Sequence, residues 1–218
     1  MNLSGDARTL WDAAVALDRA APTVSPAQAP GRTLPPMLFL TDPARTAEPW
    51  RTAQTLPAGA GVVYRAFGAS DAVVVARRLR AITADRGVRL LIGLDATLAE
   101  SIGADGVHLP ERAFALATTL RSAHPDWLLT GAVHSQDAAN AAPADLDALI
   151  LSPVFPAGGV SAEKPVLGVE AFAAVVRTTR HPIYALGGIS ADTVERLVGT
   201  GACGFAAVDA IQRAFADL

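Results

Sequence analysis

VRLLIGLDATLAESIGADGVHL, residues 88–109, contains two short apolar runs joined by a segment that is compatible with a helix. The runs VRLLIG (88–93) and DGVHL (105–109) have the length and the branched apolar side chains of strands, and residues 95–102 between them form a short crossover. A strand, a crossover helix and a second strand are the repeating unit of parallel sheets. The stretch therefore predicts an α/β protein.

The same alternation runs from Met37 to the end of the chain. Helix-compatible segments lie at residues 70–86, 112–124, 169–177 and 192–199, with another short crossover at 135–142. The strands that we expect are MLFLT (37–41), GVVYR (61–65), VRLLIG (88–93), DGVHL (105–109), LLTGAV (128–133), ALILS (148–152), PIYAL (182–186) and CGFAAV (203–208).

Eight strands in this alternation predict a single (β/α)8 TIM barrel. A doubly wound open sheet uses the same alternation and is the structural alternative. That fold binds dinucleotides through a Gly-x-Gly-x-x-Gly turn, and no such turn follows the first expected strand. The barrel is therefore the preferred prediction.

Residues 1–36 precede the alternation. The segment 3–20 predicts an extra N-terminal amphipathic helix, which caps the barrel or packs on a neighbour. Residues 21–36 are rich in Pro and Ala and predict an extended linker. The expected organisation is a helix and linker at 1–36 followed by the barrel at 37–218. The apolar side of this helix would consist of Leu10, Trp11, Ala14, Val15 and Leu17.

Length and composition narrow the class of protein. A chain of 218 residues with 51% hydrophobic residues suits one barrel domain. Its formal net charge of -3 lacks the positive field that nucleic-acid binding requires, and no apolar run approaches the roughly 20 residues of a membrane span. Cys203 is the only cysteine, so no internal disulfide can form and a reducing cytoplasm is expected. We expect a small-molecule partner, and the sequence leaves a homodimer open.

The ends of the last two expected strands predict a phosphate site. Gly187, Gly188 and Ile189 follow the seventh strand and allow close backbone approach, and a helix is expected to begin at Ser190 or Ala191. Two helix starts after strands 7 and 8 are the usual phosphate cradle of barrels. The alternative interpretation is a tight turn, with Asp209 capping its own helix and repelling an anion. After the eighth strand, the expected phosphate-binding residues are Val208 and Asp209.

Five further residues are candidates for contacting a ligand. His134 directly follows the fifth strand, where a neutral imidazole can transfer a proton, and it is the candidate catalytic residue. His108 is expected to point toward the barrel mouth, and Arg65 ends the second strand, where it can bind a carboxylate or phosphate. Residues 152–168 are rich in Gly and Pro and predict an active-site loop, in which Ser152 and the cation Lys164 would contact substrate.

Each of these residues also has a purely structural interpretation. His134 could bond a neighbouring loop, Arg65 could form a salt bridge at the rim, and the 152–168 loop could be an ordered surface connection. His124 and His181 are expected at the surface beside prolines.

Six motifs, taken in order, resemble the thiamine phosphate synthase/TenI family of (β/α)8 barrels. The likeness covers residues 37–218, and three of the motifs at these spacings are quite specific, namely GADGVHL, SPVFP and ALGGI. The motifs are LFLTD (38–42), GADGVHL (103–109), GAVHS (131–135), SPVFP (152–156), ALGGI (185–189) and AAVDAI (206–211).

The resemblance implies an activity but also shows departures. Synthases of this family join an aminopyrimidine diphosphate to a thiazole phosphate and use magnesium to neutralise the leaving group. The family's Gln-Leu-Arg-x-Lys is here Val-Tyr-Arg-Ala-Phe (63–67), its Asn-Asp pair is Gly-Leu (93–94), and its Gly-Gln with a metal-binding aspartate is Pro-Glu-Arg-Ala (110–113). Both magnesium carboxylates are missing from their places. Asp95 and Glu111 are only weak metal candidates, so magnesium is expected only if synthase activity is retained.

Three functions follow. The first is a synthase with a rearranged metal site. The second is a metal-independent thiazole tautomerase, as in the TenI branch, with His134 as acid or base. The third is a barrel that binds a phosphorylated, thiamine-related ligand without catalysis.

Overall fold

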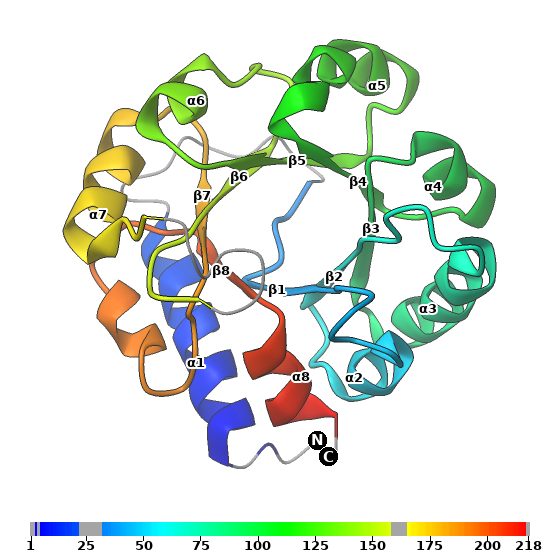
Figure 1. The fold of residues 1–218 in the computed structure, drawn as a ribbon, viewed down its shortest axis with the longest axis horizontal. Coiled ribbons are helices and arrows are strands. Elements are labelled where there is room, and N and C mark those ends of the chain that lie inside the picture. Colours follow the sequence, from blue (N-terminus) through cyan, green and yellow to red (C-terminus); the bar gives the residue numbers. More distant parts are fainter. Residues whose placement is uncertain (1–2, 4, 22–31, 158–164, 217–218) are drawn as a thin grey trace.

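The barrel closes through pairing of its first and last strands. The computed structural model describes residues 3, 5–21, 32–157 and 165–216. Its strands are all parallel, each pairs with the next in sequence, and β8 pairs with β1 (Figure 1). An open sheet has two edge strands, whereas here every strand is paired on both sides, so the barrel prediction is confirmed. The strands are β1 (Met37–Leu40), β2 (Gly61–Tyr64), β3 (Arg89–Gly93), β4 (Gly106–Pro110), β5 (Leu128–Val133), β6 (Ala148–Leu151), β7 (Ile183–Leu186) and β8 (Gly204–Ala207).

Helices alternate with the strands and surround the barrel. Most lie where the sequence predicts them, while α2 between β1 and β2 was not predicted. The segment expected as one helix at 112–124 is a 3-10 helix, η2, followed by α5. The helices are α1 (Gly5–Ala20), α2 (Pro49–Thr55), α3 (Ala72–Arg86), α4 (Ala96–Ile102), η2 (Glu111–Leu116), α5 (Ala117–Ala123), α6 (Gln136–Ala141), α7 (Gly168–Thr178), η4 (Val194–Leu197) and α8 (Asp209–Phe215).

The prediction of a helix that begins directly after β7 was wrong. No α-helix begins at Ser190 or Ala191, and the segment holds only the short 3-10 helix η4. The Thr193 hydroxyl donates to the carbonyl oxygen of Gly188 at 3.0 Å and accepts from the amide of Ser190 at 2.9 Å. These bonds close a turn over the residues where the helix would start, because a Thr side chain here competes with helical hydrogen bonding.

Helix α1 covers the side of the barrel that η4 leaves open. It contacts α8, η4, β8 and β1, and Figure 1 shows it beside α8. It therefore packs on the wall of its own barrel, which corrects the expectation of a cap on the barrel end. Of the predicted linker, residues 22–31 lie outside the described part of the chain. The side chains that α1 buries are Ala7, Leu10, Ala13, Ala14 and Leu17.

The apolar core has two layers because side chains alternate along each strand. One layer fills the barrel interior and includes Leu38, Val63 and Tyr184. The other lies between the strands and the helices and includes Phe39 and Leu149. Among the described residues, no helix has the length and apolar character to cross a membrane.

Replacing Leu10 by Ala tests whether α1 belongs to the folded barrel. Leu10 is 1% exposed, so the substitution should lower the free energy of unfolding by about 2–5 kcal/mol in denaturant titrations. Asp12→Ala on the exposed side of the same helix should change it by less than about 0.5 kcal/mol. Equal stability of the two variants would contradict the packing of α1.

Candidate functional site

A cavity of about 580 Å³ opens at the carboxyl ends of the strands. The loops after β1, β2, β6, β7 and β8 line it. It includes seven of the residues that the sequence singled out, and this end of a barrel is where ligand sites are built. Those seven are Arg65, Ser152, Gly187, Gly188, Ile189, Val208 and Asp209.

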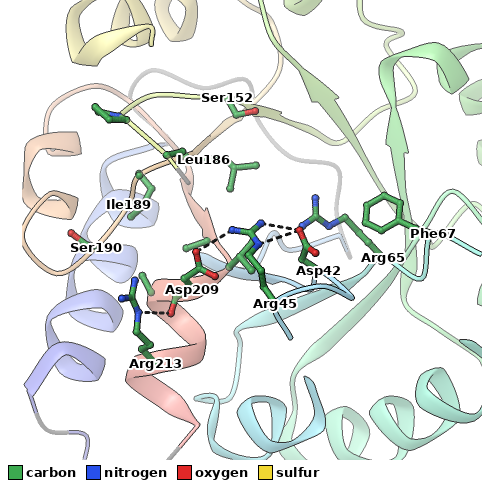
Figure 2. Close-up of a pocket in the computed structure, with 17 residues that line it drawn as sticks. Asp42, Arg45, Arg65, Phe67, Ser152, Leu186, Ile189, Ser190, Asp209 and Arg213 are labelled. Carbon is green, nitrogen blue, oxygen red and sulfur yellow. Dashed lines mark hydrogen bonds and ion pairs between the residues drawn. The ribbon is translucent and has the colours of Figure 1, made fainter. Parts of the chain in front are cut away.

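Five charged side chains alternate in sign across this cavity, and we call them the charge row. They run from Arg65 through Asp42, Arg45 and Asp209 to Arg213 (Figure 2). Arg45 binds Asp42 through Nη2 at 2.9 Å and Nε at 3.2 Å, and it reaches Asp209 through Nη1 at 3.0 Å. Three guanidinium groups and two carboxylates leave the lining with a net positive charge.

Asp42 remains a carboxylate in this setting. Burial raises the pKa of Asp42, but the hydrogen bonds from Arg45 and the Ala44 amide, with the charges of Arg45 and Arg65, together outweigh it. The pKa of Asp42 therefore lies below its ordinary value. A fixed negative charge on Asp42 holds Arg45 in place.

Arg65 is anchored by the loop after β1. Its Nε donates to the carbonyl oxygen of Thr41 at 2.6 Å, and its backbone amide donates to the Thr41 hydroxyl at 2.9 Å. Burial lowers the pKa of Arg65, but an arginine keeps its charge in proteins. The ring of Phe67 lies 5.5 Å from the guanidinium carbon. No Nη donor of Arg65 is bonded among the described residues, so both Nη groups can serve a ligand.

The Gly187-Gly188 turn is required by packing as well as by any ligand. A Cβ on Gly187 would lie 2.7 Å from Cβ of Pro153, and a Cβ on Gly188 would lie 2.4 Å from the carbonyl oxygen of Pro156. The loop after β6 therefore needs glycine at both positions. The amides of Gly188 and Ile189 have no acceptor within the described ranges, so both are available to an anion.

Asp209 begins α8, but its carboxylate does not bond its own helix. It accepts from Arg45 instead, while Arg213 Nε donates to the Asp209 carbonyl oxygen at 3.3 Å. The alternative interpretation, in which Asp209 caps its own helix, is therefore wrong. The reason is tertiary, because Arg45 arrives from the loop after β1, 164 positions away in sequence.

His108 is buried on β4 and does not line the cavity. Only 6% of it is exposed, and its Nδ1 lies 2.9 Å from the Thr130 hydroxyl. Burial and the charge of Arg65 lower the pKa of His108 to about 3. It is a neutral residue of the interior at physiological pH.

His134 is exposed and stands next to the cavity without lining it. Its Nδ1 lies 2.9 Å from the carbonyl oxygen of Ser152, which lines the cavity. A carbonyl oxygen only accepts, so Nδ1 donates to it, and in the neutral form of the ring Nε2 then carries the lone pair. The Ser152 hydroxyl lies 3.2 Å from the same Nδ1. His181, expected at the surface, is instead 5% exposed, with Nε2 2.9 Å from the Pro143 carbonyl oxygen.

The two weak metal candidates lie outside the cavity lining. The Asp95 carboxylate accepts from the Leu98 amide at 2.8 Å and so caps α4, while Glu111 begins η2. Within the described residues, no group of three or more His, Cys, Asp or Glu side chains is placed to hold a metal ion. Lys164, the predicted cation of the 152–168 loop, lies outside those residues.

Arg45 and Arg213 line the cavity although neither was predicted as a site residue. The available signal was spacing, since Arg45 follows Asp42 by three residues and Arg213 follows Asp209 by four. Such pairs point to local ion pairs but do not reveal that the two pairs meet. Phe67 was noted only as a departure from a family motif.

Comparison with known proteins identifies clear relatives. Residues 38–211 match the sequence model of a family described as thiamine monophosphate synthase. The chain is 29% identical over 140 residues to the thiamine-phosphate synthase of Leuconostoc citreum, covering 64% of this chain and 66% of that protein. It is 32% identical over 142 residues to that of Methanoculleus marisnigri, covering 65% and 67%.

The match spans only about two thirds of the length of these curated relatives, and 66% of the Leuconostoc protein. Among solved structures, thiamine phosphate pyrophosphorylase from Pyrococcus furiosus matches with a TM-score of 0.69 and 21% identity, covering 83% of this chain and 91% of that one. At this identity the structural likeness supports the fold.

The burial of His108 predicts a pH dependence of stability. Its folded-state pKa of about 3 lies below the roughly 6.5 of an unfolded histidine, so the unfolded chain takes up the proton first. Stability should fall by up to about 1.4 kcal/mol per pH unit as the pH drops from about 6.5 toward 3. Denaturant titrations at pH 7 and pH 5 should show a smaller loss for His108→Gln than for the unaltered protein. Equal losses would contradict a buried neutral His108.

Proposed function

Because the chain belongs to the thiamine monophosphate synthase family, we propose that its cavity binds a phosphorylated thiazole-like ligand of thiamine metabolism without magnesium. One observation carries the proposal. The cavity combines unbonded backbone amides at Gly188 and Ile189 with a positively charged lining, while both lining carboxylates are bound to Arg45. Amides and guanidinium groups are the usual partners of a phosphate monoester.

In this proposal the phosphate lies between the strand ends of β7 and β8. The amides of Gly188 and Ile189 bind it from one side, with Gly187 allowing the close approach. Val208 and Asp209 flank it from β8, where Arg213 adds a positive charge. Asp209 opposes binding by its negative charge, so its link to Arg45 matters for the affinity.

The ring of the ligand would extend toward β1, β2 and β6. Arg65 and Ser152 line this part of the cavity and would contact polar atoms of the ring. His108 is buried and outside the lining, so in this proposal it has a packing role and does not contact the ligand directly. The 152–168 loop, with Lys164, remains a predicted part of the site.

The residues present do not fit a magnesium site for a diphosphate. Magnesium requires oxygen ligands in near-octahedral geometry. Asp95 already caps α4, and the cavity's own carboxylates, Asp42 and Asp209, both bind Arg45. A synthase with a shifted metal site at Asp95 and Glu111 is thus the less supported alternative.

A second function, ring tautomerisation, is favoured by the geometry of His134. Because the Ser152 carbonyl oxygen accepts from Nδ1, Nε2 of a neutral His134 carries the lone pair and would act as the base. His134 would take a proton from one atom of the bound ring and return it to another, which requires no metal. Without such a reaction, the protein would be a non-catalytic binder of the same ligand.

Titration calorimetry tests the binding proposal. The thiazole phosphate should bind equally well with magnesium and with a chelator, and its dephosphorylated alcohol at least about 100-fold more weakly, because charge-assisted hydrogen bonds are lost. Equal binding of phosphate and alcohol would refute the phosphate site. As the matching activity control, added aminopyrimidine diphosphate and magnesium should yield no thiamine phosphate above background. Clear formation of thiamine phosphate would instead support synthase activity.

Substitution of His134 tests the tautomerase. His134→Ala should lower the tautomerisation rate by about 10²–10⁴-fold, because general acid-base catalysis is lost. Binding of the thiazole phosphate should stay nearly unchanged. His124→Ala, before β5 at the opposite end of the barrel, is the control and should keep the full rate. A full rate in His134→Ala would show that His134 is not the acid or base, whereas no tautomerisation by the unaltered protein would leave only the non-catalytic binder.

A further inference from the structure

Phe67 is the most exposed large apolar side chain in the described part of the chain. It lies in the loop after β2 and is 74% exposed. It also lines the cavity, and no other aromatic side chain of the described residues does so. An aromatic ring left in water adds little to the stability of a fold, because its apolar surface is not buried. Packing within this chain therefore does not account for Phe67.

The backbone of Phe67 has a conformation that phenylalanine rarely adopts. Phe67 has a φ of 48° and Gly68 a φ of 82°, and the Ala69 amide donates to the Ala66 carbonyl oxygen at 3.0 Å. A turn with positive φ at both central residues favours Asn, Asp or Gly at the first of them and Gly at the second. Gly68 follows this preference and Phe67 does not. The turn therefore places the phenyl ring at the cavity in spite of backbone strain.

Phe67 and Arg65 together form one wall of the cavity. The guanidinium carbon of Arg65 lies 5.5 Å from the centre of the Phe67 ring, and Figure 2 shows the two side chains next to each other at one end of the charge row. The Thr41 carbonyl oxygen holds Arg65 in place through Nε. This wall offers a flat apolar surface beside unbonded Nη donors. A planar ring with polar atoms at its edge matches both parts, because its face can pack on phenyl carbon and its edge can accept from Arg65.

We propose that Phe67 is a specificity-determining residue whose ring packs against the planar ring of the ligand, so that the cavity prefers aromatic phosphate monoesters to phosphate esters without a ring. This rests on the proposed function, because it concerns the other end of the same ligand. The strand ends of β7 and β8 bind the phosphate of either kind of ester, so Phe67 acts only on the remainder of the molecule. Contact between the two rings removes from water the apolar surface that Phe67 otherwise exposes.

The test compares the thiazole phosphate with ethyl phosphate, a phosphate monoester that has no ring, by titration calorimetry at one pH. The unaltered protein should bind the thiazole phosphate more tightly. Phe67→Asn removes the ring and suits the turn, so its melting temperature should not fall. Its ratio of thiazole phosphate affinity to ethyl phosphate affinity should drop about tenfold, which is the size expected for one aromatic contact. Phe67→Tyr keeps the ring and should keep the ratio.

The matched control is Leu94→Asn. Leu94 is the other non-glycine residue with positive φ in the described ranges, at 66°, and it follows β3 without lining the cavity. Its affinity ratio should equal that of the unaltered protein. An unchanged ratio in Phe67→Asn, or an equal loss of affinity for both esters, would overturn the role of Phe67 while the proposed function stands. If the unaltered protein binds neither ester, the proposed function fails and this inference fails with it.

Discussion

Pairing between β1 and β8 is the constraint on which the rest of this structure depends. The register joins Met37 to Phe205 and Phe39 to Ala207, so the two ends of the barrel sequence become neighbours. The approach is close, because a Cβ on Gly204 would lie 2.2 Å from the carbonyl oxygen of Pro36. Closure brings the loop after β1 against the start of α8, which creates the contact between Arg45 and Asp209.

Closure also explains how the outer layer is completed. The segment between β7 and β8 forms only η4, because Thr193 closes a turn where a helix would begin. A barrel strand needs a covering layer on its outer side. Helix α1 supplies it from the other end of the chain, so the N-terminal segment is part of the barrel wall rather than an appendage.

The charge of the cavity follows from the same arrangement. Its carboxylates bind Arg45 instead of being free to hold a metal, and its remaining guanidinium donors and backbone amides could bind an anion. A site of this composition suits a phosphate monoester better than a metal-bridged diphosphate. The family relationship is the basis for proposing a ligand of thiamine metabolism, and the side chains of the cavity favour a phosphate monoester within that proposal.

The sequence alone determined the strands, their order and the glycine turn after β7, because alternation of apolar runs and the backbone freedom of Gly187 and Gly188 are local properties. It also identified Arg65 and Asp209 as strand-end residues. Only the tertiary structure decided which of these side chains meet. Arg45 with Asp209, His108 inside the barrel and α1 beside η4 are contacts between distant segments, fixed by barrel closure and not by any local pattern.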